Sequence, residues 1–443
     1  MVDWQAIFDE IPVGTSEADL DKLFTSALLY EGLGFKKTEV SKSKGFRNRN
    51  NSKKKNIIPD YACYRKSDSF SHPILVVEHK SVNKNLIGQA IQEVREQMAV
   101  SSAQFGLATN GLQLQLWQRH GAISVLRTPL YNLSASNIEQ ILSEIRARLE
   151  SPRRALTAMF WAKKGGVGKT TMTANLGAAL AQEQDAKVLL VNFDLQGDLN
   201  TLTGFPQMWD YTPPVTMQEA LDDAATGVGE VRPDHLIREQ SFEVRRSRLP
   251  GQALFGSSQI YKLYVIPGDE SIKSVERRGP EGTAQMTALQ DLLEEACGHY
   301  DYIFIDASPS WIPFGKMAAH ASDILIPVID DSKFAVEAVK DLRTRYLTSE
   351  EFQEEDETSE PPMVYGCIVN CLFQGETGEN SVKRVREQLE EFDIEWRDWV
   401  MGRYAETVKS IDAQKPVVFK SPNNKATKNF LSLANSIFVD SSK

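Results

Sequence analysis

Hydrophobic runs alternate with amphipathic segments along most of the chain, and this alternation predicts a repeated succession of strands and helices. A few residues after the first apolar run of the C-terminal two thirds, the Ala- and Leu-rich segment 170–182 is typical of a helix. Repeated strand and helix units predict a doubly wound, mostly parallel α/β sheet over about residues 154–443. Its expected buried strands are residues 155–162, 187–194, 261–268, 302–306, 323–329 and 363–372.

The N-terminal third has shorter apolar runs and a different order of elements. They are an amphipathic helix at 16–34, strands at 60–65 and 73–81, a polar helix at 86–100, and two strands joined at Asn110-Gly111. This α-β-β-α-β-β order predicts a smaller α/β domain with a mixed sheet. A charged helix at 138–149 then precedes the linker-like segment 151–154, so we expect one domain at 1–150 and another at 151–443.

A glycine-rich segment, KKGGVGKTT at 163–171, lies between the first strand of the second domain and its helix. Glycines let the backbone turn its N–H groups towards a phosphate at a helix N-terminus, which is partly positive. In this pattern Lys169 contacts the β and γ phosphates, and the Thr170 hydroxyl ligates Mg²⁺. We therefore expect a nucleotide and Mg²⁺, with the nucleotide bound by Gly165, Gly166, Val167, Gly168, Lys169, Thr170 and Thr171.

Three polar residues follow or end later strands of the same predicted sheet. Asp194 ends the second strand, two strands from the phosphate loop, and its structural alternative is a helix cap. Asp306 closes the apolar run YIFID, which is the Walker B form, and we expect it to hold a Mg²⁺-bound water. Asn370 ends the last strand.

Three segments, KGGVGKTT, DLQGDLN and DASPS, resemble those of the ParA/MinD partition and positioning ATPases with a deviant Walker A box. The resemblance implies a homodimer that sandwiches ATP, in which Lys164 reaches the partner's phosphates and Asp194 helps align the attacking water. Leu195 replaces the family's usual proline. The resemblance also implies that Asn370 contacts adenine, although a structural polar role remains equally open.

In ParA-like dimers, basic residues near the C-terminus grip DNA without sequence preference, and ordinary surface lysines are the alternative. A centromere-binding or other activating protein is the partner that the resemblance implies. The lysines that match this region are Lys409, Lys415, Lys420, Lys425 and Lys428.

The N-terminal domain contains a second group of charged residues. Asp60 begins one predicted strand, and Glu78-His79-Lys80 ends the next, so the two strands can bring Asp60, Glu78 and Lys80 together. Alternation along a strand places Glu78 and Lys80 on one face and His79 on the other. Two carboxylates bind Mg²⁺ with its waters, and an ammonium steadies charge on a phosphodiester. This pattern indicates metal-dependent DNA cleavage.

The order of PDYACYR, PILVVEHKS and FGLATNGLQLQLWQ over residues 15–125 resembles the nuclease domain of type I restriction subunits and other PD-(D/E)xK nucleases. The resemblance implies that Asp60, Glu78 and Lys80 form an active site that a glutamate on the first helix, Glu17, assists. The family often has a Gln and Tyr pair on the next helix, but residues 92–97 contain no Tyr. A nuclease-derived domain that only binds DNA is therefore the alternative.

Composition and charge limit these functions further. The net charge of −10 argues against a protein that coats nucleic acid with its whole surface, so DNA contacts require local basic segments such as 36–55, which is otherwise a solvated loop. The four cysteines have no metal-ligand spacing and are expected to be reduced core residues. Without an apolar run of ~18 residues or a signal sequence, we expect no membrane and a cytoplasmic protein, nucleoid-associated when ATP-bound.

The sequence therefore predicts an ATPase that dimerises around ATP, binds DNA and segregates or positions a DNA or protein cargo. The N-terminal domain would process or bind DNA. The alternative is an ATP-gated, Mg²⁺-dependent endonuclease that acts on foreign or mobile DNA.

Overall fold

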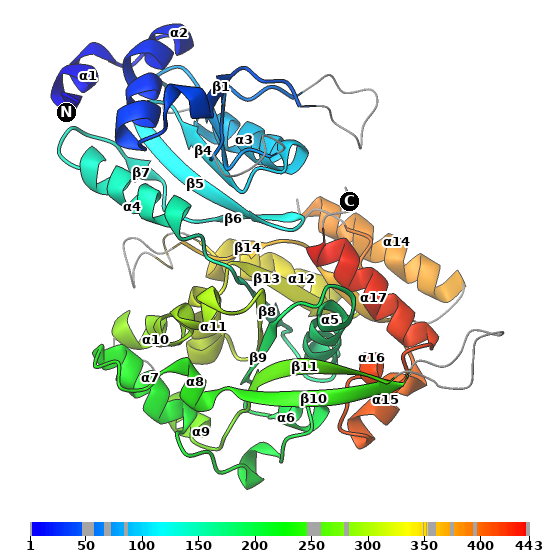
Figure 1. Ribbon diagram of the computed structural model, residues 1–443. Helices are drawn as coiled ribbons and strands as arrows, with labels where there is room; N and C mark the ends of the chain where they lie inside the picture. The colour runs from blue at the N-terminus through cyan, green and yellow to red at the C-terminus, as the bar shows by residue number, and fades with distance from the viewer. Residues whose placement is uncertain are drawn as a thin grey trace. The chain divides into compact units, whose positions relative to one another are not determined.

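The computed structural model describes residues 2–46, 57–65, 72–83, 87–245, 258–278, 283–348, 350, 352, 360–372, 376–392 and 397–439. The chain forms two compact units (Figure 1). The first unit comprises Met1–Arg153 with Phe438–Lys443, and the second comprises Arg154–Ile437. Each unit has its own sheet and hydrophobic core, so each is described by itself.

The first unit is built on a mixed sheet, as the order of its predicted elements indicates. Within the described residues, the strand order is β1-β2-β3-β4-β5-β6, and β7 pairs with β5. Only the β3 and β4 pair is parallel there; the other neighbours are antiparallel. The strands are β1 (Val40–Lys42), β2 (Tyr61–Cys63), β3 (Leu75–His79), β4 (Phe105–Thr109), β5 (Gln113–His120), β6 (Ile123–Leu126) and β7 (Tyr131–Asn132).

Helices cover both faces of this sheet. The long helix α3 packs on one face, where Gly106 of β4 leaves room for Met98. The opposite face contributes Leu75, Val77 and Leu107 to the main core, together with residues from the first helices and α4. The helical segments are α1 (Trp4–Glu10), α2 (Glu17–Leu20), η1 (Asp21–Thr25), η2 (Leu28–Gly32), η3 (Lys37–Glu39), α3 (Ile87–Ser101) and α4 (Ile138–Glu150).

The second unit has the predicted mostly parallel sheet. Within its described part, the strand order is β10-β11-β9-β12-β8-β13-β15-β16, with β14 paired to β13, and only β10 runs antiparallel to its neighbour. The strands are β8 (Leu156–Trp161), β9 (Val188–Phe193), β10 (Arg238–Arg245), β11 (Ser258–Ile266), β12 (Tyr302–Ala307), β13 (Ile324–Ile329), β14 (Met363–Val364), β15 (Ile368–Leu372) and β16 (Val400–Gly402).

Two differences from the predicted strands have physical reasons. The apolar run 363–372 divides into β14 and β15, because Gly366 between them takes a positive φ of 146° that breaks the extended backbone. The edge strands β10 and β16 were not predicted. Six of the eight residues of strand β10, REQSFEVR, are polar, and β16 has only three residues, so neither has the apolar run of a central strand.

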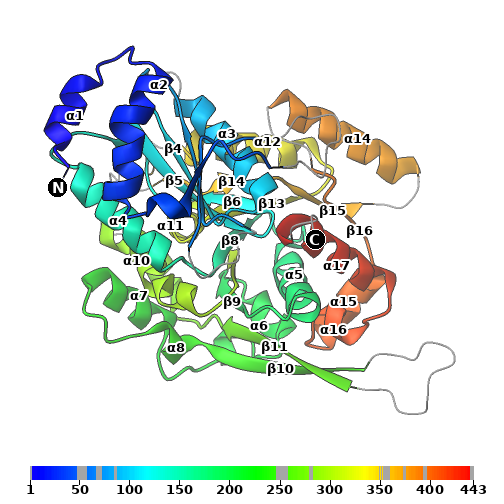
Figure 2. The same ribbon diagram turned by 45° about the horizontal axis from the view of Figure 1, so that its top comes forward.

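Helices also cover both faces of the second sheet (Figure 2). They are α5 (Lys169–Glu183), α6 (Asp198–Leu202), η5 (Met208–Asp210), α7 (Met217–Thr226), α8 (Pro233–Leu236), α9 (Ile272–Arg278), α10 (Thr283–Glu294), η6 (Ala296–Gly298), η7 (Trp311–Gly315), α11 (Lys316–His320), α12 (Lys333–Asp341), η8 (Leu342–Tyr346), α14 (Glu376–Glu391), α15 (Ala405–Asp412), α16 (Val417–Lys420) and α17 (Lys425–Phe438).

The side chains of β9 alternate between the two faces of the sheet and pack against the helices on each face. Leu189 and Val191 enter the core shared with α7, α10 and α11. Leu190 faces α5 on the other side, where a Cβ at Gly177 would lie only 2.8 Å from the Leu190 side chain. The strand is therefore apolar on both faces, as expected for a central parallel strand. The resulting close packing fixes α5, which carries the phosphate loop at its N-terminus.

A buried asparagine pair ties the loop after β9 to the end of β11. Asn192 Nδ2 donates to Asn200 Oδ1 at 2.7 Å, and the Gly268 backbone N–H donates to the same oxygen at 2.9 Å. Asn200 Nδ2 donates to the backbone oxygens of Gly268 and Pro206 at 2.8 and 3.1 Å. Both asparagines are fully buried. These bonds satisfy loop groups that have no strand partner, and so they hold the segment that begins with Asp194.

We predict that Asn200→Ala destabilises the second unit by about 2 to 4 kcal/mol, because it leaves several buried polar groups unpaired. Urea unfolding followed by circular dichroism measures the change. Thr201→Ala, a neighbouring substitution at a partly exposed position of α6, is the control and should leave the transition in place. Equal stability of Asn200→Ala and wild type would contradict the structural role of this pair.

Candidate functional site

The phosphate loop lies between β8 and α5, as the sequence predicts. Gly166 and Gly168 have positive φ angles of 80° and 91°, which a side chain rarely adopts, and Gly168 is the N-cap of α5. Asn370 Nδ2 donates to the Val167 backbone oxygen at 2.7 Å, and a Cβ at position 168 would lie 2.3 Å from that nitrogen. Asn370 therefore braces the loop, and its contact with adenine stays a prediction.

Lys169 brings the ends of two strands together beneath the loop. Its Nζ lies 2.7 Å from Asp194 Oδ2, which follows β9, and 2.6 Å from Asp306 Oδ1, which lies in β12. The three side chains are at most 7% exposed. Burial by itself lowers the pKa of Lys169, but attraction by Asp306 and Asp194 outweighs it and raises the pKa. Lys169 is therefore held as a buried ammonium between two carboxylates.

The same cluster fits a divalent cation. Burial raises the pKa of Asp306, and the charge of Asp194 raises it further, while Lys169 lowers it. Asp306 Oδ2 is buried, and the described residues offer it no hydrogen bond. The hydroxyl of Thr170 is close enough to lower the pKa of Asp306 as well. Hydroxyl and carboxylate oxygens are the hard ligands that Mg²⁺ takes, so Thr170 and Asp306 have the chemistry to hold it.

The remaining loop residues lie at the surface. Lys164 is 55% exposed along its side chain and pairs with Asp330, which follows β13, at 2.5 Å. Gly165 is exposed, and Thr171 is half-buried in the first turn of α5. The exposed position of Lys164 is compatible with a contact to a second subunit, which stays a prediction.

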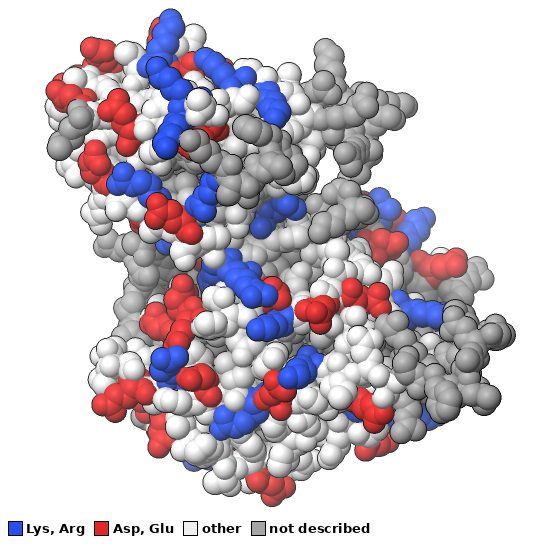
Figure 3. Space-filling view, viewed as in Figure 1, with Lys and Arg blue, Asp and Glu red and all other residues white. Residues whose placement is uncertain are grey.

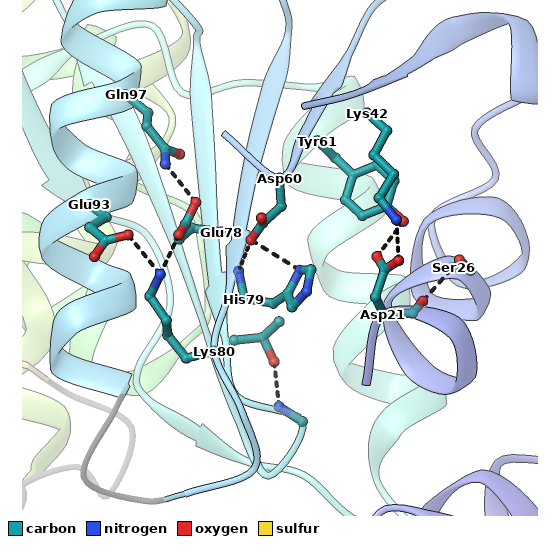
Figure 4. A network of polar contacts seen from close by, with 12 residues as sticks. Asp21, Ser26, Lys42, Asp60, Tyr61, Glu78, His79, Lys80, Glu93 and Gln97 are labelled. Atoms are coloured by element: carbon teal, nitrogen blue, oxygen red, sulfur yellow. Dashed lines mark hydrogen bonds and ion pairs between the residues drawn. The ribbon is translucent and has the colours of Figure 1, made fainter. Parts of the chain in front are cut away.

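The second predicted group of charged residues lies at the end of β3 in the first unit (Figure 4). Glu78 and Lys80 lie on the α3 side of the sheet, as alternation predicts, and Lys80 Nζ is 2.6 Å from Glu78 Oε1. Two residues of α3 complete the contacts. Glu93 Oε2 accepts from Lys80 Nζ at 2.7 Å, and Gln97 Nε2 donates to Glu78 Oε2 at 2.6 Å.

Asp60 lies beside β3 but turns towards His79. Its Oδ2 accepts from the His79 backbone N–H at 2.8 Å and is 3.1 Å from the His79 Nδ1. It is nevertheless close enough to Glu78 to raise the pKa of that carboxyl. The end of β3 therefore brings Glu78 and Lys80 into contact, and the start of the neighbouring strand β2 places Asp60 next to them.

The acid that the helical segment after Ser16 directs at the sheet is Asp21, and the assistance expected from Glu17 stays a prediction. Glu17 lies in the exposed first turn of α2. Asp21, one turn later, is 7% exposed and accepts hydrogen bonds from the Tyr61 hydroxyl at 2.5 Å and from Lys42. Burial raises the pKa of Asp21, but these two hydrogen bonds bring it below its usual value. Only the helical register shows which acid faces inward.

The two glutamates that contact Lys80 have pKa values shifted in opposite directions. Burial, then the neighbouring Glu93 and Asp60, raise the pKa of Glu78 to about 7. Burial also raises the pKa of Glu93, but hydrogen bonds with Glu78 and Lys80 lower it to about 2. Glu78 and Asp60 are hard-oxygen donors in a crowded negative site, and one or two carboxylates with waters suffice for Mg²⁺. Their chemistry therefore fits this cation.

Sequence reasoning missed Glu93 and Gln97. Both lie on α3, where Gln89, Glu93 and Gln97 recur every four residues and so share one helix face. The spacing Q-x3-E-x3-Q was visible in the sequence, but which sheet residues this face would meet was not.

The candidate DNA-binding lysines near the C-terminus differ in exposure. Lys409, Lys420, Lys425 and Lys428 are exposed. Lys415 is half-buried, and its Nζ donates to the Glu243 backbone oxygen at 2.6 Å. In the first unit, several Lys and Arg side chains adjoin one another on the face shown in Figure 3. The basic segment 36–55 is described only as far as residue 46.

Residues 157–357 match the family model described as an AAA domain. The virulence plasmid ParA family protein pGP5-D of Chlamydia psittaci is 23% identical over 292 residues, which cover 63% of this chain and 93% of that protein. The chromosome partitioning protein ParA of Caulobacter vibrioides is 32% identical over 182 residues, which cover 41% of this chain and 58% of that protein.

The solved structures that are similar include the septum site-determining protein MinD of Pyrococcus horikoshii in complex with Mg-ADP. It is 21% identical with a TM-score of 0.43 and covers 64% of this chain and 96% of that one. Together with the sheet order and the phosphate loop, the matched sequences support a P-loop ATPase fold similar to that of ParA for the second unit. Across the described residues, no helix is both long and apolar enough to span a membrane.

We predict a pH-dependent contribution of Glu78 to stability. Its pKa is raised from 4.5 to about 7 in the folded chain, so the folded state binds more protons than the unfolded state in this interval and loses stability as the pH rises through it. The pKa of Glu93 is lowered to about 2, so the folded state loses the stability that Glu93 contributes as the pH falls below 4.5, outside this interval. Glu78→Gln should therefore gain stability relative to wild type as the pH is raised from 4.5 to 7.

Chemical unfolding at a series of pH values measures this difference. Glu17→Gln, which neutralises an exposed acid of the same unit, is the control and should show a flat difference from wild type. A flat difference for Glu78→Gln would show that this carboxyl does not bind a proton in that interval.

Proposed function

We propose that the chain is a ParA-like ATPase that dimerises around ATP, binds DNA and segregates or positions a DNA or protein cargo. The observation that carries this proposal is the buried ammonium of Lys169 between Asp194 and Asp306, directly beneath a glycine loop with two left-handed glycines. A structural lysine would not require a glycine loop at a helix N-terminus, the arrangement whose backbone N–H groups bind an anion. The matched partition proteins support the same assignment.

Each residue of this cluster has a separate task. The Lys169 ammonium meets the nucleotide phosphates, and the loop N–H groups bind the phosphate oxygens. Thr170 and Asp306 hold Mg²⁺, which when bound neutralises negative charge on the phosphates. Asp194 accepts a hydrogen bond from the attacking water and orients it. Asn370 keeps the loop in the conformation that the phosphates require.

The dimer and the DNA contacts rest on exposed lysines. Lys164 pairs with Asp330 within the described part of the chain, and its side chain is 55% exposed, so a second subunit's phosphate can compete for it. Lys425 and Lys428 lie one turn apart on the exposed side of α17, and a dimer would present two such pairs to a DNA backbone. In this proposal the ATP-bound protein is associated with the nucleoid, and a partner protein or DNA stimulates hydrolysis.

We predict that Lys169→Ala abolishes ATP binding, because it removes the side-chain cation beneath the phosphates. Lys164→Ala should retain ATP binding but lose dimerisation and hydrolysis. Calorimetry with ATP and Mg²⁺ measures binding, and light scattering measures the mass of the particle with and without nucleotide.

Lys163→Ala is the matched control, since Lys163 is an exposed lysine directly before Lys164 and lies 3.9 Å from Asp341. A wild type that remains monomeric with ATP at micromolar concentration would contradict the proposed dimer around ATP. If Lys163→Ala and Lys164→Ala dimerise with ATP to the same extent, Lys164 has no role in the dimer that Lys163 lacks.

A second candidate function, an ATP-gated Mg²⁺-dependent DNA endonuclease in defence, is favoured by the Glu78 and Lys80 contact with Asp60 beside it. A carboxylate and an ammonium at the end of a strand, with a second carboxylate within electrostatic reach, are the groups that phosphodiester cleavage needs. The nature of the neighbouring genes separates the two roles: a small basic centromere-binding protein favours segregation, and a methyltransferase favours defence.

We predict that, in this second function, the wild type nicks supercoiled plasmid with Mg²⁺ or Mn²⁺. Asp60→Ala and Glu78→Ala should eliminate nicking because each removes an oxygen ligand. Lys80→Ala should retain metal binding but stop turnover. Gel electrophoresis of the plasmid, with and without ATP, measures the product.

Nicking that persists in Asp60→Ala would point to a contaminant or to another site. A wild type that never nicks, under any metal or nucleotide condition, favours a domain that only binds DNA.

A further inference from the structure

Helix α3 presents one polar stripe to the end of β3. Gln89, Glu93 and Gln97 recur at four-residue spacing, and each makes a hydrogen bond along this stripe. Gln97 is 4% exposed and holds Glu78, while Gln89 Nε2 donates to Glu93 Oε1 at 2.7 Å. The stripe therefore fixes both carboxylates that flank Lys80.

The Lys80 ammonium is shared between two acids from different elements. It lies 2.6 Å from Glu78 and 2.7 Å from Glu93 (Figure 4). The side chain of Lys80 is 12% exposed and that of Glu78 is 6% exposed, whereas that of Glu93 is 37% exposed. An exposed ion pair contributes little to stability, but a buried ammonium needs well-placed partners. Glu93 thus holds Lys80 from the solvent side.

The contact with Glu93 matters most when Glu78 is engaged elsewhere. If Glu78 gives its oxygens to a metal ion, its attraction for Lys80 weakens, because the metal neutralises its charge. Among the described residues, Glu93, which already accepts a hydrogen bond from Lys80, is then the carboxylate that holds it in the site. Asp60 does not replace it, since its carboxylate is turned towards His79.

We propose that Glu93 is a positioning residue for DNA cleavage, which keeps the Lys80 ammonium over the reacting phosphodiester while Glu78 ligates the metal. This role rests on the second candidate function. It assigns to α3 a part in the reaction that the resemblance to PD-(D/E)xK nucleases did not assign to this position.

The test compares Glu93→Gln, Glu93→Asp and the control Glu96→Gln in the full chain. Glu96 is an exposed acid on the same helix, so its substitution makes the same charge change outside the stripe. We expect Glu93→Gln to lower kcat for plasmid nicking with Mn²⁺ by about tenfold to a hundredfold, the cost of a misplaced group, with KM unchanged. Glu93→Asp should recover part of the rate, and Glu96→Gln should match wild type.

Two further measurements separate positioning from other roles. Calorimetric titration with Mn²⁺ alone should give wild-type affinity for Glu93→Gln and reduced affinity for Glu78→Gln. Acetylation of lysines with acetic anhydride, followed by mass spectrometry, should modify Lys80 faster in Glu93→Gln than in wild type or Glu96→Gln, because the ammonium has lost its outer partner.

Each outcome decides the proposal. An active wild type with Glu93→Gln at full rate overturns the role of Glu93 and leaves the nuclease function standing. Loss of Mn²⁺ affinity in Glu93→Gln overturns positioning, because Glu93 would then be a metal ligand. Unchanged acetylation of Lys80 overturns the holding contact. A wild type that cuts no DNA overturns the nuclease function and this role together.

Discussion

The buried ion cluster of Lys169, Asp194 and Asp306 is the constraint on which the second unit depends. One ammonium faces two carboxylates in a water-poor site, so the cluster retains an excess negative charge and favours a further cation. The parallel strands β9 and β12 place the two acids at one edge, and β8, next to β12, places the loop and Lys169 above them. The order of the central strands therefore brings together the groups that give the site its chemistry.

The first unit repeats this electrostatic arrangement with other elements. At the end of β3, one ammonium, that of Lys80, again lies between two carboxylates, those of Glu78 and Glu93. In both units a helix supplies one member of the cluster and a strand end supplies another. Burial, and after it the neighbouring carboxylates, raise the pKa of a strand acid in each case, Asp306 in one and Glu78 in the other. Both sites therefore have the charge that a divalent cation neutralises.

Much of the fold followed from local patterns, because central parallel strands are continuous apolar runs and the phosphate loop needs glycines at fixed places. The two edge strands β10 and β16 lacked such a pattern, since a strand with one open edge can be polar or short. In the first unit, alternation along β3 correctly placed Glu78 and Lys80 on one face. It could not show that Asp60 turns towards His79, since that depends on packing between strands.

The sequence by itself determined the elements that carry the phosphate loop and the strand-end acids, because these depend on residue type and spacing within short segments. Only the tertiary structure decided that Asn370 contacts the loop across the sheet, that Asp21 faces inward and meets Tyr61, and that Glu93 meets Lys80. These contacts join residues that lie from 13 to 203 positions apart. They arise when helices pack onto sheets, and helical register and packing then select which polar side chains face inward.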